Sequence, residues 1–392
     1  MTDRYKQKNL SQGNVVKQLI FFALPFILSN LIQTFYSVAD MIVVGQFSGT
    51  VSMSGVNIGG QVTLLMTNLA VGINTGATVL IAQSIGAEKL KRLYNALSAI
   101  MRGMGDSKSP LYFITIACFT NVVLDLLFVG GFHMGAVGAG IATVISQAFS
   151  VLLCVVYLVK RKFIFDFHIR SFGIDIIQLR AILKLGIPIS VQNLIGNVSF
   201  LFITSLVNSY GVTASAAVGA VGKYNGFAIL PAIAMNAAIS TMCAQNFGAG
   251  REDRAKKTCL AGMIISIMIS YTIFIFTALF PEEILGLFTK DRELIHVGVE
   301  YLRAFSIDYF LVPFAFSMNG LFIGAGHTTY SLFTNIMSGI IVRMPMAFLF
   351  SSVFGLGLFG VGLAVPSATL CSIVLNLWFL LSGRWKMRTI HI

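Results

Sequence analysis

The 392-residue sequence is poor in charge: Asp, Glu, Lys and Arg make up only 11% of it, under half the share in a typical soluble domain. Acidic residues are the scarcest, with 15 Asp and Glu against 33 Phe. Hydrophobic residues reach 56%, so polar groups are too few to cover a water-exposed surface. These shortages exclude a soluble globular protein and predict an integral membrane protein whose solvent is lipid.

Sequence motifs for catalysis and for resident metals are also lacking. The five cysteines are scattered in or beside apolar runs without a CxxC pair, which predicts neither a disulfide nor a metal site. No HExxH, GxSxG or P-loop is present, and the GxGxxG at 355–360 follows no soluble strand. The polar first 16 residues and the long apolar run after them predict no cleaved signal peptide. We therefore expect neither an enzyme nor a bound cofactor.

The net charge of +12 is distributed in a way that argues against a nucleic-acid partner. Most of the basic residues gather in five clusters, and these clusters recur on alternate loops between apolar runs. This is the positive-inside pattern of a multi-pass protein with both termini in the cytoplasm, and we expect it in the plasma (inner) membrane. The clusters are 4–17, 89–108, 160–184, 251–257 and 384–388.

Apolar runs long enough to cross a bilayer, roughly 20 residues each, occur ten times. The basic stretch 161–181 is expected to be a cytoplasmic linker between an N-terminal lobe of four helices (1–160) and a C-terminal lobe of six (182–392). The expected class is all-α, polytopic and about ten-helical. The runs are 18–44, 54–83, 109–130, 135–159, 182–209, 215–243, 258–280, 297–323, 329–352 and 358–382.

The two lobes are related by an internal repeat. IAQSIGAEKLKR (81–92) matches CAQNFGAGREDR (243–254), and MGAVGAGIA (134–142) matches LGLFGVGLA (356–364). The matched basic loops are expected on the same side of the membrane, so the repeat is parallel rather than inverted. The offset grows by about 59 residues between the two matches, which is the length of two helices and a loop. We expect the N-terminal lobe to lack the third and most of the fourth helix of a six-helix unit.

Three carboxylates, those of Asp40, Asp125 and Asp308, lie within apolar runs away from the run ends. A carboxylate in hydrocarbon is costly and commonly marks an ion or proton pathway. Asn121 lies one helical turn before Asp125, and Thr143 offers a hydroxyl on the next run. Such oxygens are ligands that Na⁺ accepts, and the same carboxylates can hold a proton. The alternative is plain hydrogen bonding between helices.

Charged residues of the second lobe allow two interpretations. Asp308 and Arg343 lie on neighbouring runs, where they form either a structural ion pair or polar groups of a substrate cavity. Lys223 is open to the same two interpretations. Pro25 and four other prolines fall within predicted helices and are expected to bend them, as structural kinks or as hinges.

Several segments together resemble the multidrug and toxic compound extrusion (MATE) family of the multidrug/oligosaccharidyl-lipid/polysaccharide flippase superfamily. They include ALPFILSNLIQTFYSVADMIVVGQFS, AQSIGAEKLKR, MRGMGDSKSPLYF with NVVLD, MGAVGAGIATVISQ and AQNFGAGREDR. The resemblance implies two lobes around a central cavity that export amphipathic or cationic organic compounds, by alternating access, in exchange for Na⁺ or H⁺. It places the coupling cation in the N-terminal lobe and a bend of the first helix at Pro25. The implied cation site is Asp40, Asn121, Asp125 and Thr143.

The sequence departs from the family's pattern at two points. The N-terminal lobe is short of a helix pair, so we expect it to open to lipid or water near Asp40 and Asp125. The run at 191–200 also lacks the Glu of another branch, and Asp308 is not in clear register with that branch's acid. We expect a monomeric cation-coupled drug antiporter. The alternatives are a lipid-linked saccharide flippase, which favours a cationic cavity, and a non-transporting remnant, which the missing pair favours.

Overall fold

The computed structural model describes residues 10–35, 71–73, 75–76, 78–79, 101, 106, 108–160, 176–289 and 291–386. These residues form helices and short connections, and the described part of the chain contains no strand. The expected all-α class is confirmed. Its elements are a first helix (Val15–Phe35), α3 (Lys108–Asp125), η2 (Leu126–Gly131), α4 (Gly135–Lys160), α5 (Ile176–Asn208), α6 (Val212–Ala228), α7 (Leu230–Gly248), α8 (Glu252–Leu279), α9 (Pro281–Gly286), α10 (Arg292–Gly324), α11 (Thr328–Ile336), η4 (Met337–Arg343), α12 (Met344–Phe348), η5 (Leu349–Val353) and α13 (Gly357–Leu381).

Eight spans among the described residues are long and apolar enough to cross a membrane. They correspond to eight of the ten expected runs, and α4 covers a ninth, at 135–159. The run at 54–83 falls mostly outside the described residues, and those described between 71 and 79 are helical. Helix α5 begins at Ile176, so its first turn and a half lies within the stretch that we expected to be linker.

Proline divides one long span into two helices, as expected. The span Val212–Gly248 consists of α6, which ends at Ala228, and α7, which has Pro231 in its first turn. Proline has no N–H to donate and its ring crowds the carbonyl one turn earlier, so a new helix begins there more readily than the old one continues. The chain therefore bends in the middle of this span.

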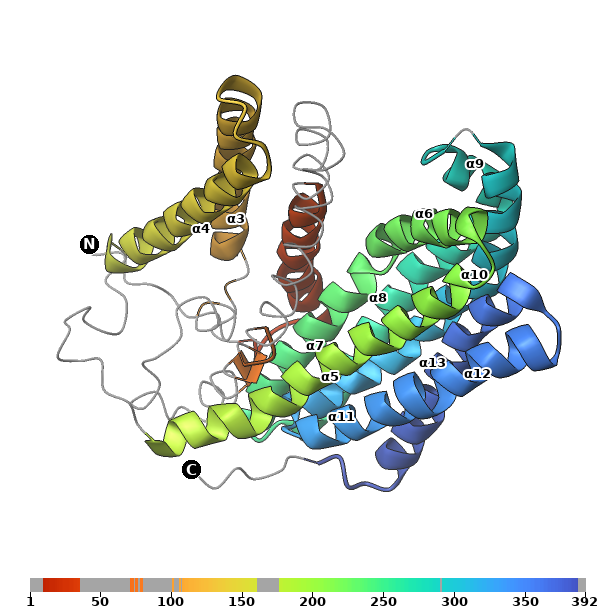
Figure 1. Ribbon diagram of the computed structural model, residues 1–392. Helices are drawn as coiled ribbons and strands as arrows, with labels where there is room; N and C mark the ends of the chain where they lie inside the picture. The colour runs from red at the N-terminus through yellow and green to blue at the C-terminus, as the bar shows by residue number, and fades with distance from the viewer. Residues whose placement is uncertain are drawn as a thin grey trace.

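Helix α10 is the centre of the second lobe, where α7, α8 and α13 enclose it (Figure 1). Glycines bring the backbones together: a Cβ added at Gly324 would lie 2.6 Å from the carbonyl oxygen of Ser240 on α7. One added at Gly362 on α13 would lie 2.8 Å from the carbonyl oxygen of Tyr301 on α10. Small residues permit this close packing, which holds helices together in lipid where the hydrophobic effect cannot.

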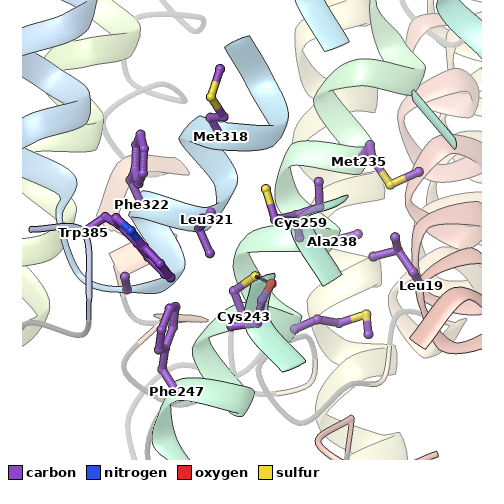
Figure 2. Packing of buried hydrophobic residues seen from close by; sticks show 14 of the residues in the cluster. Leu19, Met235, Ala238, Cys243, Phe247, Cys259, Met318, Leu321, Phe322 and Trp385 are labelled. Atoms are coloured by element: carbon purple, nitrogen blue, oxygen red, sulfur yellow. Dashed lines mark hydrogen bonds between the residues drawn. The ribbon is translucent and has the colours of Figure 1, made fainter. Parts of the chain in front are cut away.

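A buried cluster joins α7, α8 and α10 to the C-terminal segment and to the first helix (Figure 2). Trp385, 4% exposed, stacks edge-on against Phe247 and lies beneath the ammonium group of Lys256. On the other side of the cluster, Leu19 of the first helix packs towards Met235 of α7. The segment after α13 and the start of the first helix thus belong to one buried cluster of the second lobe.

The internal repeat is visible in matching backbone details. Helices α4 and α13 start at Gly135 and Gly357, which are 222 residues apart in sequence and have φ angles of 57° and 55°. Each is preceded by a π-helical segment, η2 or η5, and by a stacked aromatic pair. The pairs, Phe128 with Phe132 and Phe350 with Phe354, are also 222 residues apart. The predicted parallel repeat is therefore a structural one.

The contacts between the lobes follow the same symmetry. The first helix packs on α7 with Ala23 and Ala238 in one buried cluster, while the described residues between 71 and 79 pack on α5. There, a Cβ added at Gly76 would lie 2.6 Å from the backbone nitrogen of Gly186. Gly186 is the repeat partner of Ala23 at an offset of 163 residues, and Ala238 is the repeat partner of Gly76 at the offset of 162 residues that relates 81–92 to 243–254. In Figure 1 the first helix lies between the α3–α4 pair and the second lobe.

We expect Gly324→Ala to destabilise the second lobe, because α7 must move away from the added methyl group. The expected loss is about 1–3 kcal/mol, seen as a lower melting temperature in detergent. Gly222→Ala on α6 is the matched control, since a Cβ there has nothing within 4 Å. Equal melting of the two variants would contradict the close-packing account.

Candidate functional site

The first-lobe candidates come from two helices in contact, α3 and α4. The amide nitrogen of Asn121 donates to the hydroxyl of Thr143 at 3.4 Å, and Thr143 donates in turn to the carbonyl oxygen of Ala139 at 3.0 Å. Asn121 is 1% exposed and Asp125 is 0% exposed. The structure therefore brings Asn121 and Thr143 together and buries Asp125 one helical turn away, as the sequence spacing predicts.

Burial of Asp125 goes against one expectation at this residue. The lobe was expected to open to lipid or water near this carboxylate, yet its side chain has no solvent exposure. Asp125 is the last residue of α3, directly before the π-helical segment η2. A π-helical turn is rare and often found at functional sites, because it shifts the side chains that follow it around the helix axis. The Oδ1 of Asn121, also buried, has no hydrogen-bond partner in the described structure and remains a candidate oxygen ligand.

Asp40, the remaining member of the predicted site, lies outside the described residues, so its distance from Asp125 stays a prediction. Its helix is described as far as Phe35. Pro25 is buried in that helix, and its carbonyl oxygen accepts a hydrogen bond from the Ser29 hydroxyl at 2.8 Å. The role of Pro25 as a hinge also stays a prediction. The first helix reaches α3, where the Sγ of Cys118 lies 4.0 Å from the carbonyl oxygen of Ile32.

Asp308 and Arg343 of the second lobe do not form the ion pair that was one of the two interpretations. Asp308 on α10 is 4% exposed and accepts a hydrogen bond from the Thr369 hydroxyl of α13 at 2.5 Å. The guanidinium of Arg343 donates to the Ser199 hydroxyl at 3.4 Å and lies 4.6 Å from the ring centre of Phe200, both on α5. Helix α13 contacts both α10 and η4, and no salt bridge joins the two charges among the described residues.

The remaining candidate, Lys223, is exposed on α6. Within the described part of the chain its side chain makes no hydrogen bond or ion pair, and we assign it no place in a polar site.

The repeat shows a difference between the lobes that the sequence analysis missed. At the offset of 222 residues, Asn121 corresponds to Arg343 and Asp125 corresponds to Ala347, which is fully buried. The first lobe thus has an amide and a carboxylate where the second has a guanidinium and a methyl group. At these matched positions the first lobe carries an acidic group and the second a basic one, while the second lobe buries its own carboxylate, Asp308, on α10.

Two related lobes of apolar helices, each with buried polar groups, are an architecture that many membrane transporters share. The MatE family model matches residues 25–99 and 188–349, more than half of the chain. The chain belongs to this family, so it is a multi-pass membrane transporter and not an enzyme.

Relatives and solved structures agree with this assignment. A Bacillus subtilis protein named probable multidrug resistance protein YpnP is 27% identical over 444 residues, covering 97% of this chain and 98% of that protein. A Thermotoga maritima protein named probable multidrug resistance protein NorM is 24% identical over 439 residues, covering 95% and 94%. A crystal structure described as MATE in complex with MaD3S has a TM-score of 0.90 at 22% identity, over 97% of this chain and 99% of that one. The 444-residue alignment is longer than this chain, so the relative has residues that this chain lacks.

We expect Thr369→Val to lower the stability of the second lobe, because it removes the hydroxyl that bonds the buried Asp308 carboxylate. An unsatisfied buried group of this kind costs about 1–3 kcal/mol, read as a drop in the melting temperature in detergent. Thr369→Ser should restore the bond. Thr272→Val, at an exposed threonine bonded only to its own helix, is the control. Wild-type melting of the Thr369→Val variant would show that the bond contributes nothing.

Proposed function

We propose that this transporter exports small amphipathic or cationic organic compounds across the plasma membrane in exchange for Na⁺ or H⁺. The observation that carries the proposal is the fully buried carboxylate of Asp125 beside the Asn121–Thr143 pair in a membrane-spanning lobe. The family assignment and the names of the two bacterial relatives support drug export. Both termini are proposed to lie in the cytoplasm and the working unit to be a monomer.

Coupling follows from the cost of a charge in hydrocarbon. Insertion of a carboxylate at the centre of a membrane helix costs about 2.5–3.5 kcal/mol on insertion scales. Binding of a cation or a proton neutralises the carboxylate and is therefore favoured. Asp125 and Asn121 supply oxygens from one turn of α3, and Thr143 supplies one from α4; Asp40 would complete the set. Hard oxygen donors of this type suit Na⁺, and the same carboxylates accept a proton. Loading and release of that cation would alter the charge within the lobe.

The first helix is the element through which this change would reach the second lobe. It contacts α3 at Cys118, and the ammonium group of Lys108 lies 5.8 Å from the ring centre of Phe21. It also contacts the second lobe over its length, from Leu19 in the cluster with α7 to Phe35, whose ring lies 5.8 Å from that of Phe227. A shift of α3 caused by cation binding would therefore move the first helix and change its contacts with the second lobe.

The test is efflux of a fluorescent cation such as ethidium from proteoliposomes under an imposed Na⁺ or H⁺ gradient. We expect Asp125→Asn and Asp40→Asn each to abolish stimulation by the gradient, since the amide keeps the size of the side chain but cannot be neutralised by a cation. A coupling free energy of 1–3 kcal/mol corresponds to a loss of about 5- to 150-fold.

Asp253→Asn, at an exposed acid on α8, is the control for the loss of one charge and should behave as wild type. Gradient-driven efflux at the wild-type rate in Asp125→Asn would refute the coupling site. Absence of ethidium efflux in the unmodified protein under both gradients would refute the export of this substrate class.

A further inference from the structure

Residues 10–18, here called the strap, lead into the first helix and lie against the loop between α7 and α8 in the second lobe. Leu10 and Ser11 are each 4% exposed, although they precede every described helix. The Leu10 side chain belongs to the cluster formed with α7, α8 and α10. The strap is therefore bound to the second lobe, while the helix that it begins also contacts α3 of the first.

Three side chains of the second lobe hold the strap by its backbone. The amide oxygen of Gln245 accepts from the backbone N–H of Leu10 at 2.9 Å. Arg251 donates to the carbonyl oxygen of Ser11 at 2.9 Å. Arg254 donates to the carbonyl oxygen of Gly13 at 2.7 Å, to that of Leu10 at 3.4 Å, and to the side-chain oxygen of Gln18 at 2.9 Å. The planar guanidinium of Arg254 thus connects the start, the middle and the end of the strap.

These anchors come from the repeated sequence motif, which the transport site does not use. Gln245, Arg251 and Arg254 are the polar residues of CAQNFGAGREDR that face the strap, and the loop itself turns at Gly250, with a φ of 70°. Cation-rich loops of this kind lie on the cytoplasmic side in the proposed topology. The bonds of the strap to the second lobe consequently lie at that side of the membrane.

We propose that the strap is a latch that holds the two lobes together at the α7–α8 loop, with Arg254 as its main anchor. Behind the latch, Leu19 and Ala23 of the first helix are buried against α7 and α8. The lobes separate at this end only when the bonds of Arg254 to the strap are released. The inference rests on the proposed transport function for its purpose in alternating access, although the contact itself does not depend on transport.

The experiment measures whether loss of the anchor opens the interface behind it. Ala23, 2% exposed between the lobes, is replaced by cysteine in a chain whose native cysteines are changed to alanine or serine, and its rate of labelling by a water-soluble maleimide is followed. Arg254→Gln should raise that rate about tenfold or more, because hydrogen bonds to a charged group are lost. Lys257→Gln, at an exposed lysine one helical turn further on α8, is the matched control and should change nothing.

A second reporter separates opening from unfolding. Val221→Cys, 1% exposed within the second lobe and away from the strap, should stay unlabelled when Arg254→Gln exposes position 23. If both positions label, the variant is unfolded, and Gln18→Ala, which removes one acceptor of Arg254, replaces it with a smaller expected increase. Arg254→Lys keeps a single donor group and should give an intermediate rate.

Labelling of position 23 at the wild-type rate in folded Arg254→Gln would overturn the latch. Labelling does not require transport, so failure of ethidium efflux in the same proteins would count against the proposed function and leave the latch standing. Conversely, wild-type labelling combined with full efflux would count against the latch alone.

Discussion

Contact between helix backbones at glycine is the constraint on which the second lobe depends. Lipid tails are as apolar as the side chains that they would displace, so helices associate only where they fit closely enough for dispersion and hydrogen bonds to act. Gly320 and Gly324 bring α10 onto α7, and Gly362 brings α13 onto α10. Once α10 is enclosed, Asp308 is buried with it and needs the Thr369 hydroxyl of α13. The polar contacts of this lobe are thus consequences of the packing rather than its cause.

The parallel repeat gives the two lobes one architecture and different charges. The π-helical segments η2 and η5, and the helix starts at Gly135 and Gly357, agree closely between lobes. His133 has a positive φ of 54° where its repeat partner is glycine, so the backbone geometry persists even where the residue that favours it does not. The side chains differ, however: Asn121 and Asp125 of the first lobe correspond in the repeat to Arg343 and Ala347 of the second. The two repeats therefore share a backbone fold but differ in the charge that they carry at matched positions.

Helix positions could be predicted from the sequence because a membrane span requires a long apolar run with few alternatives. The repeat and the shared face of Asn121 and Asp125 could also be predicted, because both depend on spacing along the chain. Contacts between distant segments could not. Thr369 gives no sign that it bonds Asp308, 61 residues away. The sequence shows Arg254 only as one of several basic residues in a cytoplasmic loop, although its hydrogen-bond partners lie 236 to 244 residues earlier. The contacts of the repeated motif CAQNFGAGREDR with residues 10–18 could not be predicted for the same reason.

The position of the first helix has a consequence for how the protein is made. Its buried residues face α7 and α8, and the backbone of Leu10 bonds a side chain 235 residues later in the chain. At about 5–20 residues per second of synthesis, that partner emerges roughly 12–50 s after Leu10 does. During this interval the side of the first helix that carries Leu19 and Phe22 can contact only lipid or other proteins of the membrane. Every newly made copy therefore passes through a stage in which this side of the first helix lacks its native partners, and that stage ends only when the second lobe has been inserted.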